Sequence, residues 1–438
     1  MLANALTLPC GATLPNRLCK AAMTEGLATV DGRPTAALPR LYGVWSDGGA
    51  GLLLSGNVQI DADHLERPGN VVIDREPDEA MCQALRAWTS AGTRAGNHFW
   101  AQISHAGRQT QKMVNPHPKA PSAVKLGLPG GQFGQPIAMT EEDITEVIAG
   151  FVRCARVCKD NGFTGVQLHS AHGYLLSQFL SPRSNQRMDQ WGGSLENRAR
   201  LLLTVASEVR AAVGPEYPVA VKLNSADFQK GGFEFTDSVQ VAQWLEATGI
   251  DLIEISGGTY EQPKLLNLEG VEPIETQAVK ESTRAREAYF VDFAQAMRQQ
   301  ITIPLMVTGG LRRLDAMEEA LTSESADVIG IGRPMCVMTD APKKLLAGQT
   351  ELPRYENTLS LLPAWLKGLE KLNLVRTVAT FATQYWYYEQ IARIGLTGEA
   401  SHDLGVFAAT RQQMSAANRL VRGRAAQTLI QTNSDDNS

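Results

Sequence analysis

The sequence lacks long apolar runs and long runs of charge of one sign. No window reaches the roughly 18 apolar residues that a transmembrane helix needs, and the start, MLANALTLPCGATLPN, has no basic segment followed by an apolar stretch. The 46 acidic and 41 basic side chains are mixed along the 438 residues and give a net charge of -5, which argues against nucleic acid or an anionic membrane as partners. We therefore expect a cytoplasmic protein whose partners are small molecules, with homo-oligomerisation left open.

Cysteine is scarce and scattered, with six in the chain. Only Cys154 and Cys158 lie close together, and their i, i+4 spacing falls within an apolar helical pattern, so both are expected to be core thiols. No spacing typical of a zinc site or an iron–sulfur cluster is present, and no cysteine follows Cys336. We therefore expect no metal centre built on cysteine.

Motifs for permanently bound dinucleotides and for nucleoside triphosphates are also missing. The segment 330-GIGRPM-335 has Met335 at the third glycine position of the dinucleotide fingerprint, and no βαβ unit of ~30 residues with a ribose-binding acid follows it. No Walker lysine motif occurs. A phosphate site in this chain would therefore suit a mononucleotide.

What the chain does contain is an alternation of short, β-rich apolar runs with segments of helical periodicity, which is the signature of βα units and a parallel sheet. The apolar runs are 18–23, 51–56, 99–104, 165–169, 219–223, 251–255, 304–308 and 327–331. The helical segments are 77–95, 141–161, 195–213, 236–248, 285–300 and 314–322. Eight such runs predict an α/β protein, a (β/α)8 TIM barrel over residues 1–340.

Residues that are chemically unusual for a core cluster where these runs end, namely Thr24, Asn57, Gln102, His169, Lys222, Ser256, Gly309 and Gly332. In a TIM barrel the carboxyl ends of the strands meet at one rim, where active sites lie. The proline-rich segment 105–139 cannot be helical and is expected to form a long loop at this rim. The rim is therefore the predicted place of the site.

The alternation of strands and helices stops after Pro334. Residues 341–426 are predicted to form a helical C-terminal extension, followed by a flexible polar tail at 427–438. Helical spacing is shared by a stripe of apolar positions at Val375, Val378, Phe381, Tyr385 and Tyr388. We expect this stripe to pack on the barrel or on a neighbouring subunit, and a lid over the active site is the alternative.

Two histidines stand at the end of the fourth run, in 166-VQLHSAHGYLLSQFLSP-182. His169 and His172 are three residues apart, so their imidazoles are expected to face one cavity. Such a pair can donate hydrogen bonds to a carbonyl, nitro or phenolate oxygen and draw electrons from a conjugated C=C bond. A metal site with His105 as third ligand and a purely structural pair are the alternatives.

Two glycine-rich turns follow the last two runs, 308-TGG-310 and 330-GIGRP-334. Glycines let backbone N–H groups approach an anion, and Arg333 adds a charge-assisted donor. TIM barrels commonly bind a phosphate between these two loops. We therefore expect a phosphate site here, with ordinary tight turns as the alternative.

Three further strand ends suit a flavin. Lys222 would place a positive charge beside the anion that forms at N1 and C2=O of a reduced flavin. Gln102 offers a donor and an acceptor to the pyrimidine edge, and Thr24 can hydrogen-bond near O4 and N5. Each of them has an alternative as a satisfied polar group of the core, and it is their joint placement at strand ends that favours a flavin site.

Taken together, these segments resemble the old yellow enzyme family of NAD(P)H:flavin oxidoreductases over roughly residues 1–340. The resemblance rests on 16-NRLCKAAMTE-25, 102-QISHAGR-108, 167-QLHSAHGYLLSQFLSPRSNQRMDQWGGSLENR-198, 307-VTGG-310 and 330-GIGRP-334, in the family's order. It implies an FMN-dependent ene-reductase in which non-covalently bound FMN is reduced by NADPH or NADH. The flavin is then reoxidised by an activated alkene, an α,β-unsaturated carbonyl or nitro compound.

Carried over position by position, the resemblance also implies roles for residues. FMN would be held by Ala22, Met23, Thr24, Asn57, Gln102, Lys222, Gly309, Gly310, Gly332 and Arg333. His169 and His172 would bind the substrate's electron-withdrawing group, and Tyr174 would be the proton donor. Three of these positions depart from the family, since many members have Pro at 22 and Arg at 222, and one branch has a redox-tuning Cys at 24.

Three other functions stay open at this point. One is oxidative demethylation or dehydrogenation on the same flavin. Another is a metal-dependent barrel hydrolase or lyase that uses His169, His172 and His105. The third is a non-catalytic flavin-binding or interaction protein whose aromatic C-terminal stripe binds a partner.

Overall fold

The core of the molecule is a closed barrel of eight parallel strands. The computed structural model describes residues 1–128, 131–256, 291–362 and 373–435. Around the barrel the strands run β3 (Leu18–Lys20), β4 (Leu52–Gln59), β6 (His98–Ser104), β9 (Gly165–Ser170), β10 (Val219–Asn224), β11 (Leu252–Ser256), β12 (Leu305–Thr308) and β13 (Val328–Ile331). The barrel closes because β3 pairs with both β13 and β4. Each predicted run forms one of these strands, which confirms the (β/α)8 barrel.

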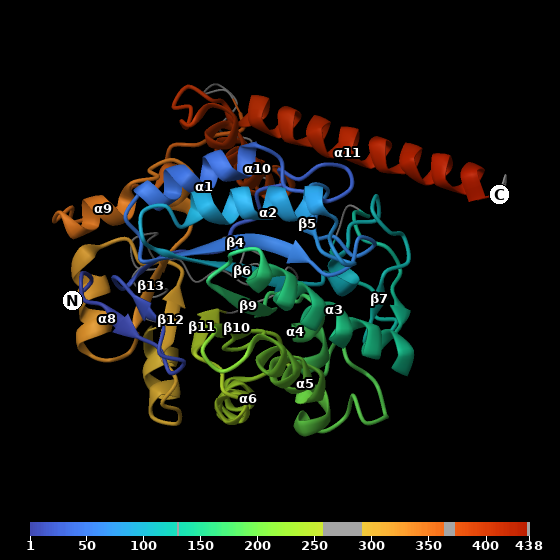
Figure 1. The fold of residues 1–438 in the computed structure, drawn as a ribbon, viewed down its shortest axis with the longest axis horizontal. Helices are drawn as coiled ribbons and strands as arrows, with labels where there is room; N and C mark the ends of the chain where they lie inside the picture. The colour runs from blue at the N-terminus through green and yellow to red at the C-terminus, as the bar shows by residue number, and fades with distance from the viewer. Residues whose placement is uncertain (129–130, 257–290, 363–372, 436–438) are drawn as a thin grey trace.

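Helices cover the outside of the barrel (Figure 1). The predicted ones are α2 (Glu79–Gly92), α3 (Glu141–Asp160), α5 (Leu195–Val213), α6 (Phe235–Ala247) and α8 (Leu314–Thr322). The sequence pattern does not predict α1 (Ala37–Asp47) or α4 (Leu175–Leu180). Every residue of α4 is buried, so this helix has no polar face to reveal its period. The predicted helix at 285–300 lies partly outside the described residues.

Local capping chemistry starts the two longest helices of the barrel. Ser194 Oγ accepts the backbone N–H of Asn197 at the start of α5, as the sequence predicts for Ser194. Thr140 and Asp143 form a reciprocal capping box at the start of α3. These two helices therefore begin where their side chains satisfy the first free N–H groups.

Alternate residues of each strand face the barrel interior. Near the amino-terminal ends the inward side chains form one apolar cluster of Cys19, Leu52, Leu54, Trp100, Ala220, Leu252, Met306 and Val328. A hairpin of β1 (Leu6–Thr7) and β2 (Thr13–Leu14) adds Leu8 and Leu14 to this cluster and closes that end of the barrel. The polar inward residues are left at the opposite, carboxyl-terminal mouth.

One irregularity in β4 matters for the mouth. The register of β4 against β6 shifts between Leu54, which pairs with Trp100, and Asn57, which pairs with Gln102. Because successive side chains alternate between faces, the extra residue lets Asn57 face inward as Leu54 does. A short strand, β5 (Val71–Val72), continues the pairing of β4 beyond this point.

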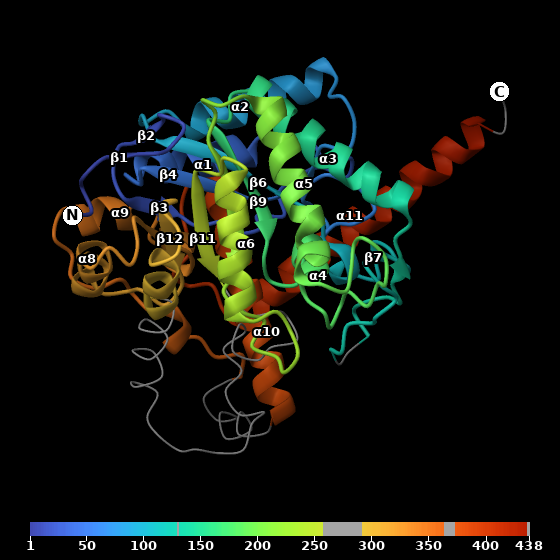
Figure 2. The same ribbon diagram turned by 90° about the horizontal axis from the view of Figure 1, so that it is seen from below.

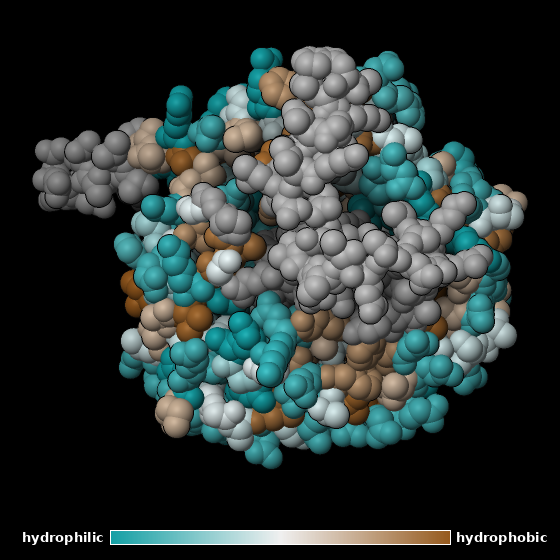
Figure 3. All heavy atoms as spheres, turned by 180° about the vertical axis from the view of Figure 1, so that it is seen from behind, coloured by the Kyte–Doolittle hydropathy of each residue, from teal (hydrophilic) through white to brown (hydrophobic). Residues whose placement is uncertain are grey.

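In its described residues, 105–128 and 131–139, the predicted long loop contains no α-helix. These residues hold a 3-10 turn, η1 (Gly107–Gln109), and two short strands, β7 (Lys119–Ala120) and β8 (Ile137–Ala138), which pair in parallel. The described part of the rear face intersperses hydrophilic and hydrophobic side chains, in line with the mixed charge pattern (Figure 3). No helix within the described ranges is both long and apolar enough to cross a bilayer.

The chain after the barrel forms η2 (Arg333–Cys336), α9 (Ala341–Leu346), η3 (Tyr355–Asn357), α10 (Asn373–Thr397) and α11 (Val406–Asp435). Helix α10 packs against α1 and η2. Helix α11 follows α10 and projects beyond the barrel with its C-terminal end (Figures 1 and 2). It continues to Asp435, past the predicted end of the helical extension at 426.

Among the described side chains of α10, the most deeply buried ones lie outside the predicted apolar stripe. Val378 is 49 % exposed, whereas Ala382, Trp386 and Ile391 are buried. Trp386 Nε1 donates to the carbonyl of Leu404 (2.7 Å), which joins α10 to the turn before α11. Large apolar and aromatic residues occur on several sides of α10, so their spacing alone does not identify the packed face.

Candidate active site

A row of buried polar side chains crosses the carboxyl-terminal mouth of the barrel. Gln102 Nε2 donates to Gln167 Oε1 (2.7 Å), and Gln167 Nε2 donates to Glu254 Oε2 (2.8 Å). Lys222 Nζ donates to Glu254 Oε1 (2.8 Å), and the strand register places Lys222 beside His169. The inward positions of four neighbouring strands therefore meet, as predicted for Gln102, His169 and Lys222.

The two predicted histidines face each other at this mouth. His169 Nε2 lies 3.3 Å from His172 Nδ1. The outer nitrogens are engaged as well, because His169 Nδ1 lies 3.1 Å from Asn57 Oδ1 and His172 Nε2 lies 2.6 Å from Ser256 Oγ. His172 has φ +59°, a left-handed conformation that turns its ring back toward His169. The structure thus brings the pair together as the sequence predicts.

Both imidazoles are neutral near pH 7. Burial, then the neighbouring His172 and Lys222, hold the pKa of His169 well below its usual range. Burial and then Lys222 do the same to the pKa of His172. Each ring therefore carries one proton, and the position of that proton decides which nitrogen donates.

Backbone contacts hold the turn that carries His172. Its N–H donates to Asn224 Oδ1 (3.1 Å), and its carbonyl accepts from Gln109 Nε2 (3.0 Å). Gln178 Nε2 donates to the carbonyl of Gly173 (2.7 Å). Three elements, β10, η1 and α4, therefore fix a backbone conformation that a histidine rarely adopts.

Tyr174 stands directly before α4 and is 3 % exposed. Its ring centroid lies 4.7 Å from that of His169, at an interplanar angle of 58°. The structure therefore places all three residues of the predicted catalytic trio at one mouth. Proton donation by Tyr174 stays a prediction.

Thr24, which follows β3, and Asn57, which lies near the carboxyl end of β4, contact a carboxylate that the sequence does not single out. Thr24 Oγ1 donates to Glu66 Oε2 (2.7 Å), and Asn57 Nδ2 lies 3.3 Å from the same oxygen. The Thr24 proton is thus directed at Glu66, so the hydroxyl oxygen faces any other partner as an acceptor. Ala22 and Met23 are partly buried beside this strand end.

The two glycine turns after β12 and β13 have the backbone that an anion site needs. Gly309 and Gly310 have φ +122° and +78°, values that side chains rarely adopt. A Cβ at Gly332 would meet no atom within 4 Å, so free space lies over that backbone. Both observations fit a phosphate that approaches the main chain closely.

Two arginines accompany these turns. Arg333 lies 3.2 Å and Arg312 lies 3.8 Å from the same Glu356 oxygen, so two cations share one carboxylate. Burial, then Arg333, lower the pKa of Arg312 to about 10. Arg312 Nε and Thr308 Oγ1 are buried and have no hydrogen-bond partner within the described residues. This surplus of positive charge and of polar atoms without partners fits the phosphate of FMN.

The metal alternative fails on the position of His105. This histidine stacks on His64 at 4.4 Å, and Asp61 joins them to make the only cluster of metal-type ligands among the described residues. His64 Nε2 accepts the N–H of Lys119 (2.9 Å), and His105 Nδ1 accepts that of Gly107 (3.1 Å). Each ring therefore already uses one nitrogen lone pair, and its N–H faces Asp61 Oδ2, which lies 2.7 Å from His64 Nδ1 and 3.7 Å from His105 Nε2.

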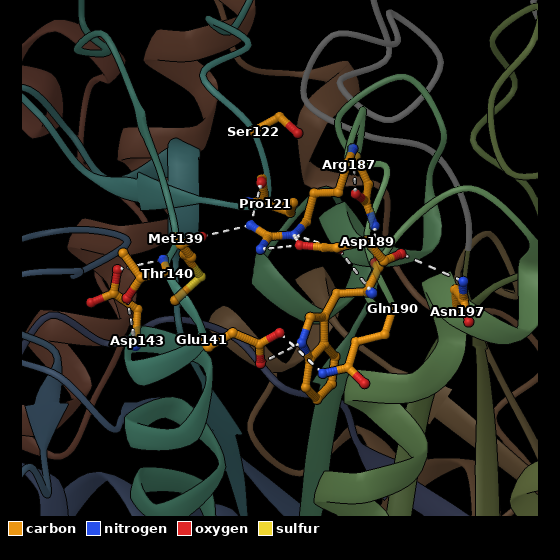
Figure 4. Close-up of polar contacts among 12 residues, drawn as sticks. Pro121, Ser122, Met139, Thr140, Glu141, Asp143, Arg187, Asp189, Gln190 and Asn197 are labelled. Atoms are coloured by element: carbon orange, nitrogen blue, oxygen red, sulfur yellow. Dashed lines mark hydrogen bonds and ion pairs between the residues drawn. The ribbon is translucent and has the colours of Figure 1, made fainter.

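The segment 182–198, which carries much of the resemblance, forms polar contacts with the long loop at 105–139 (Figure 4). Arg187 pairs with Asp189 (2.6 Å) and donates to the carbonyls of Pro121 (3.1 Å) and Met139 (2.6 Å). These contacts tie the long loop after β6 to the turn before α5. The motif is thus partly a scaffold for the loop at the rim.

A polar barrel mouth, with glycine turns and arginines after the last two strands, fits a flavin-dependent oxidoreductase. The chain belongs to the NADH:flavin oxidoreductase / NADH oxidase family, whose profile matches residues 8–351. It is accordingly an FMN enzyme of the old yellow enzyme type that takes its electrons from a nicotinamide nucleotide.

Two fungal relatives share this family. The chain is 34 % identical over 423 residues to the NADH-dependent flavin oxidoreductase iccE of Talaromyces variabilis, a match that covers 91 % of this chain and 99 % of that protein. It is 38 % identical over 354 residues to the NADH-dependent flavin oxidoreductase iliE of Neonectria sp. (strain DH2). The second match covers 77 % of this chain but only 46 % of that protein, so the chain spans under half of its length.

Two solved structures are also similar. The old yellow enzyme homologue from Zymomonas mobilis superposes with a TM-score of 0.66 at 26 % identity, over 83 % of this chain and 97 % of that one. Morphinone reductase superposes with a TM-score of 0.64 at 25 % identity, over 80 % of this chain and 91 % of that one.

Three residues of the site are missed by sequence reasoning. Glu254 stands two residues before Ser256 in the β11 run, so the period of two could have placed it inward. Arg312 follows the 308-TGG-310 turn and could have been counted with it. No sequence signal marks Glu66, because it lies in a loop whose path only the tertiary structure gives.

Proposed function

We propose that the chain reduces the C=C bond of α,β-unsaturated carbonyl or nitro compounds. The observation that supports this most is the pair of ring nitrogens, His169 Nε2 and His172 Nδ1, 3.3 Å apart at the barrel mouth. One oxygen of an electron-withdrawing group can contact both. Relatives whose names say reductase, such as morphinone reductase, fit the same direction of reaction.

The FMN-binding residues in this proposal are the ten positions named from the resemblance, with Arg312 added. Gly309, Gly310, Gly332, Arg333 and Arg312 would hold the phosphate, and Ala22, Met23, Thr24, Asn57, Gln102 and Lys222 would hold the ring system. When bound, FMN supplies hydride to the substrate's β-carbon after reduction by a nicotinamide nucleotide. Lys222 keeps positive charge beside the ring, and Glu254 holds its ammonium in place.

The chain's own residues would then position the substrate and manage the proton. The histidine pair binds the substrate oxygen and draws electrons from the alkene, which makes the β-carbon an acceptor. Tyr174, buried beside His169, holds the proton that the α-carbon receives. The barrel of residues 1–340 carries this whole site in the proposal, and the extension supports its rim.

The binding part is tested on FMN itself. We expect Arg312→Met to raise the Kd of FMN about tenfold or more, because a charge-assisted hydrogen bond to phosphate contributes roughly 1.5–3 kcal/mol. Quenching of FMN fluorescence on binding measures this directly. Arg313→Met is the matched control, since Arg313 pairs with Asp315 on the exposed side of the same turn and should leave the Kd unchanged.

The chemical part is tested anaerobically. NADH or NADPH should bleach the flavin, and an enone or a nitroalkene should restore its colour in a second step. A chain that is bleached by either nucleotide but reoxidised by none of a panel of activated alkenes would overturn the proposed substrate class.

A further inference from the structure

Glu254 on β11 is a fully buried carboxylate inside the barrel, with 0 % of its surface exposed. Its Oε1 accepts from Lys222 Nζ (2.8 Å), and its Oε2 accepts from Gln167 Nε2 (2.8 Å). Both oxygens are therefore engaged by side chains of neighbouring strands. Glu254 is not among the residues expected to contact FMN or substrate, so its buried negative charge must act through other residues.

The strand register places this ion pair between the apolar end of the barrel and the histidines. Glu254 pairs with Met306, which belongs to the apolar cluster near the amino-terminal ends of the strands. Lys222 pairs with His169 on its other side. Burial is the main cause of the low pKa values of His169 and His172, and the Lys222 charge lowers both further. The ammonium charge thus reaches the mouth, and the carboxylate lies on the side of Lys222 that faces away from His169.

The ion pair places less net positive charge at the mouth than an unpaired lysine would. The Lys222 ammonium has three N–H donors, of which Glu254 takes one. The other donors can contact an anion, but the carboxylate offsets much of the positive charge because a protein interior screens charges weakly. A reduced flavin carries a negative charge at N1 and C2=O, and an oxidised flavin does not. The pair therefore stabilises the reduced form less than an unpaired Lys222 would.

The same carboxylate fixes the direction of two amides. A carboxylate can only accept, so Gln167 must turn its NH2 group toward Glu254. The other side of that amide, Oε1, then accepts from Gln102 Nε2 (2.7 Å). Gln102 thus uses one N–H inside the barrel and keeps its Oε1 and its second N–H for a ligand. An acceptor beside a donor is what the N3–H and C2=O of a flavin need.

We propose that Glu254 is a positioning residue that lowers the reduction potential of bound FMN, because it holds the Lys222 ammonium and offsets its charge. This role rests on the proposed function, which places FMN beside Lys222. A lower potential favours hydride transfer from the flavin to an alkene and disfavours hydride transfer to the flavin from a nicotinamide nucleotide. Glu254 thus sets how the driving force is divided between the two half-reactions.

Glu254→Gln tests this role, since a glutamine of similar size can still accept from Lys222 but carries no charge. We expect reduced FMN to gain about tenfold in affinity relative to oxidised FMN. For a two-electron couple this ratio corresponds to a rise of about 30 mV in the midpoint potential. Anaerobic equilibration with a reference dye of known potential measures the shift. Reduction by NADH should become faster and reoxidation by an enone slower, whereas a merely structural defect would slow both.

Two control variants separate charge from other effects. Asp251→Asn removes a second buried carboxylate, which pairs with Arg210 directly before the same strand, at the opposite end of the barrel. Gln167→Met breaks the amide contacts without a change of charge and should weaken the binding of both redox forms alike. Both variants should leave the midpoint potential unchanged. An unchanged potential in Glu254→Gln, or an equal rise in either control, overturns the proposal.

A second pair of variants carries the test if Glu254→Gln does not bind FMN. Lys222→Met removes the cation and leaves the carboxylate, so the midpoint potential should fall. The double variant Lys222→Met/Glu254→Gln removes both charges and should return the potential toward that of the unmodified protein. A double variant whose potential stays as low as that of Lys222→Met would show that the Glu254 charge does not reach the flavin, which overturns the proposal.

Failure of this role and failure of the proposed function give different results. A potential that shifts as expected, in a protein that no activated alkene reoxidises, refutes the proposed substrate class alone. An unshifted potential in Glu254→Gln, in a protein that still reduces enones, refutes the role of Glu254 alone.

Discussion

The molecule contains two pairs of buried histidines that have opposite relations to the barrel mouth. His64 and His105, the closed pair, stack on each other and direct their N–H groups at Asp61, while backbone N–H groups fill their lone pairs. His169 and His172, the open pair, turn two ring nitrogens toward each other at the mouth. The closed pair thus has a structural role, because it holds backbone groups in place, whereas the open pair can bind a ligand.

The two pairs differ in the groups that form hydrogen bonds with their ring nitrogens. Backbone groups cannot be displaced without unfolding a segment, so the closed pair has nothing to offer a ligand. In the open pair, the ring nitrogens contact only side chains, including each other. A substrate oxygen can therefore replace the contact between the two rings. A buried histidine therefore indicates a site only when its partners can be exchanged.

The largest expected effect concerns the residue beside the open pair. Tyr174→Phe removes one hydroxyl and should slow reoxidation of the reduced flavin by an enone about 10²- to 10⁴-fold, the usual loss when a general acid is removed. Stopped-flow absorbance measures both half-reactions, and reduction by NADH should change less than twofold. An undiminished rate of reoxidation would show that the proton comes from elsewhere and that Tyr174 only packs on His169.

The closed pair should instead report on stability and pH. Burial, then the charge of His64, lower the pKa of His105 to about 4, below its ordinary value of 6.5. Between these pH values the unfolded chain binds more protons than the folded protein does. The free energy of unfolding therefore falls as the pH drops from 6.5 to 4. At about 1.4 kcal/mol per unit, His105 accounts for at most about 3 kcal/mol of that fall.

Urea denaturation at several pH values checks this. His105→Phe should reduce the slope of the unfolding free energy against pH. This expectation does not depend on how much stability the variant loses at any single pH. His402→Gln, a change of an exposed histidine, should leave the slope as it is. Parallel slopes for His105→Phe and the unmodified chain would mean that His105 is not held neutral.

The two pairs also show how far sequence carries the interpretation. His169 and His172 follow a strand end at a spacing of three, so the pattern of inward residues predicts them together. His64 and His105 are 41 positions apart in number, and only folding brings their loop and strand end into contact. His105 was therefore available as a third metal ligand on sequence grounds, although its partners lie elsewhere. Glu66 is missed for the same reason.

Substitution of one ring from each pair gives the next smaller effect. His169→Ala should raise the Kd of a phenol about tenfold, since it removes one hydrogen-bond partner of the ligand oxygen. His64→Ala should leave that Kd within about threefold and lower the melting temperature instead. Charge-transfer absorbance of the phenol complex and thermal unfolding measure the two quantities. Equal losses of phenol affinity in His169→Ala and His64→Ala would contradict the assignment of ligand binding to the open pair alone.

The smallest expected effect is none at all, and it concerns zinc. To bind a metal through Nδ1, His64 would have to give up the proton that it shares with Asp61 while its Nε2 still accepts from Lys119. Both lone pairs of that ring would then be engaged, which makes it an imidazolate, and His105 faces the same obstacle because Gly107 occupies its Nδ1. Zinc should therefore neither raise the melting temperature nor be retained after dialysis. Binding of stoichiometric zinc to the unmodified protein, and its loss in His64→Ala, would contradict this. It would show that a metal can displace the backbone N–H groups from the closed pair.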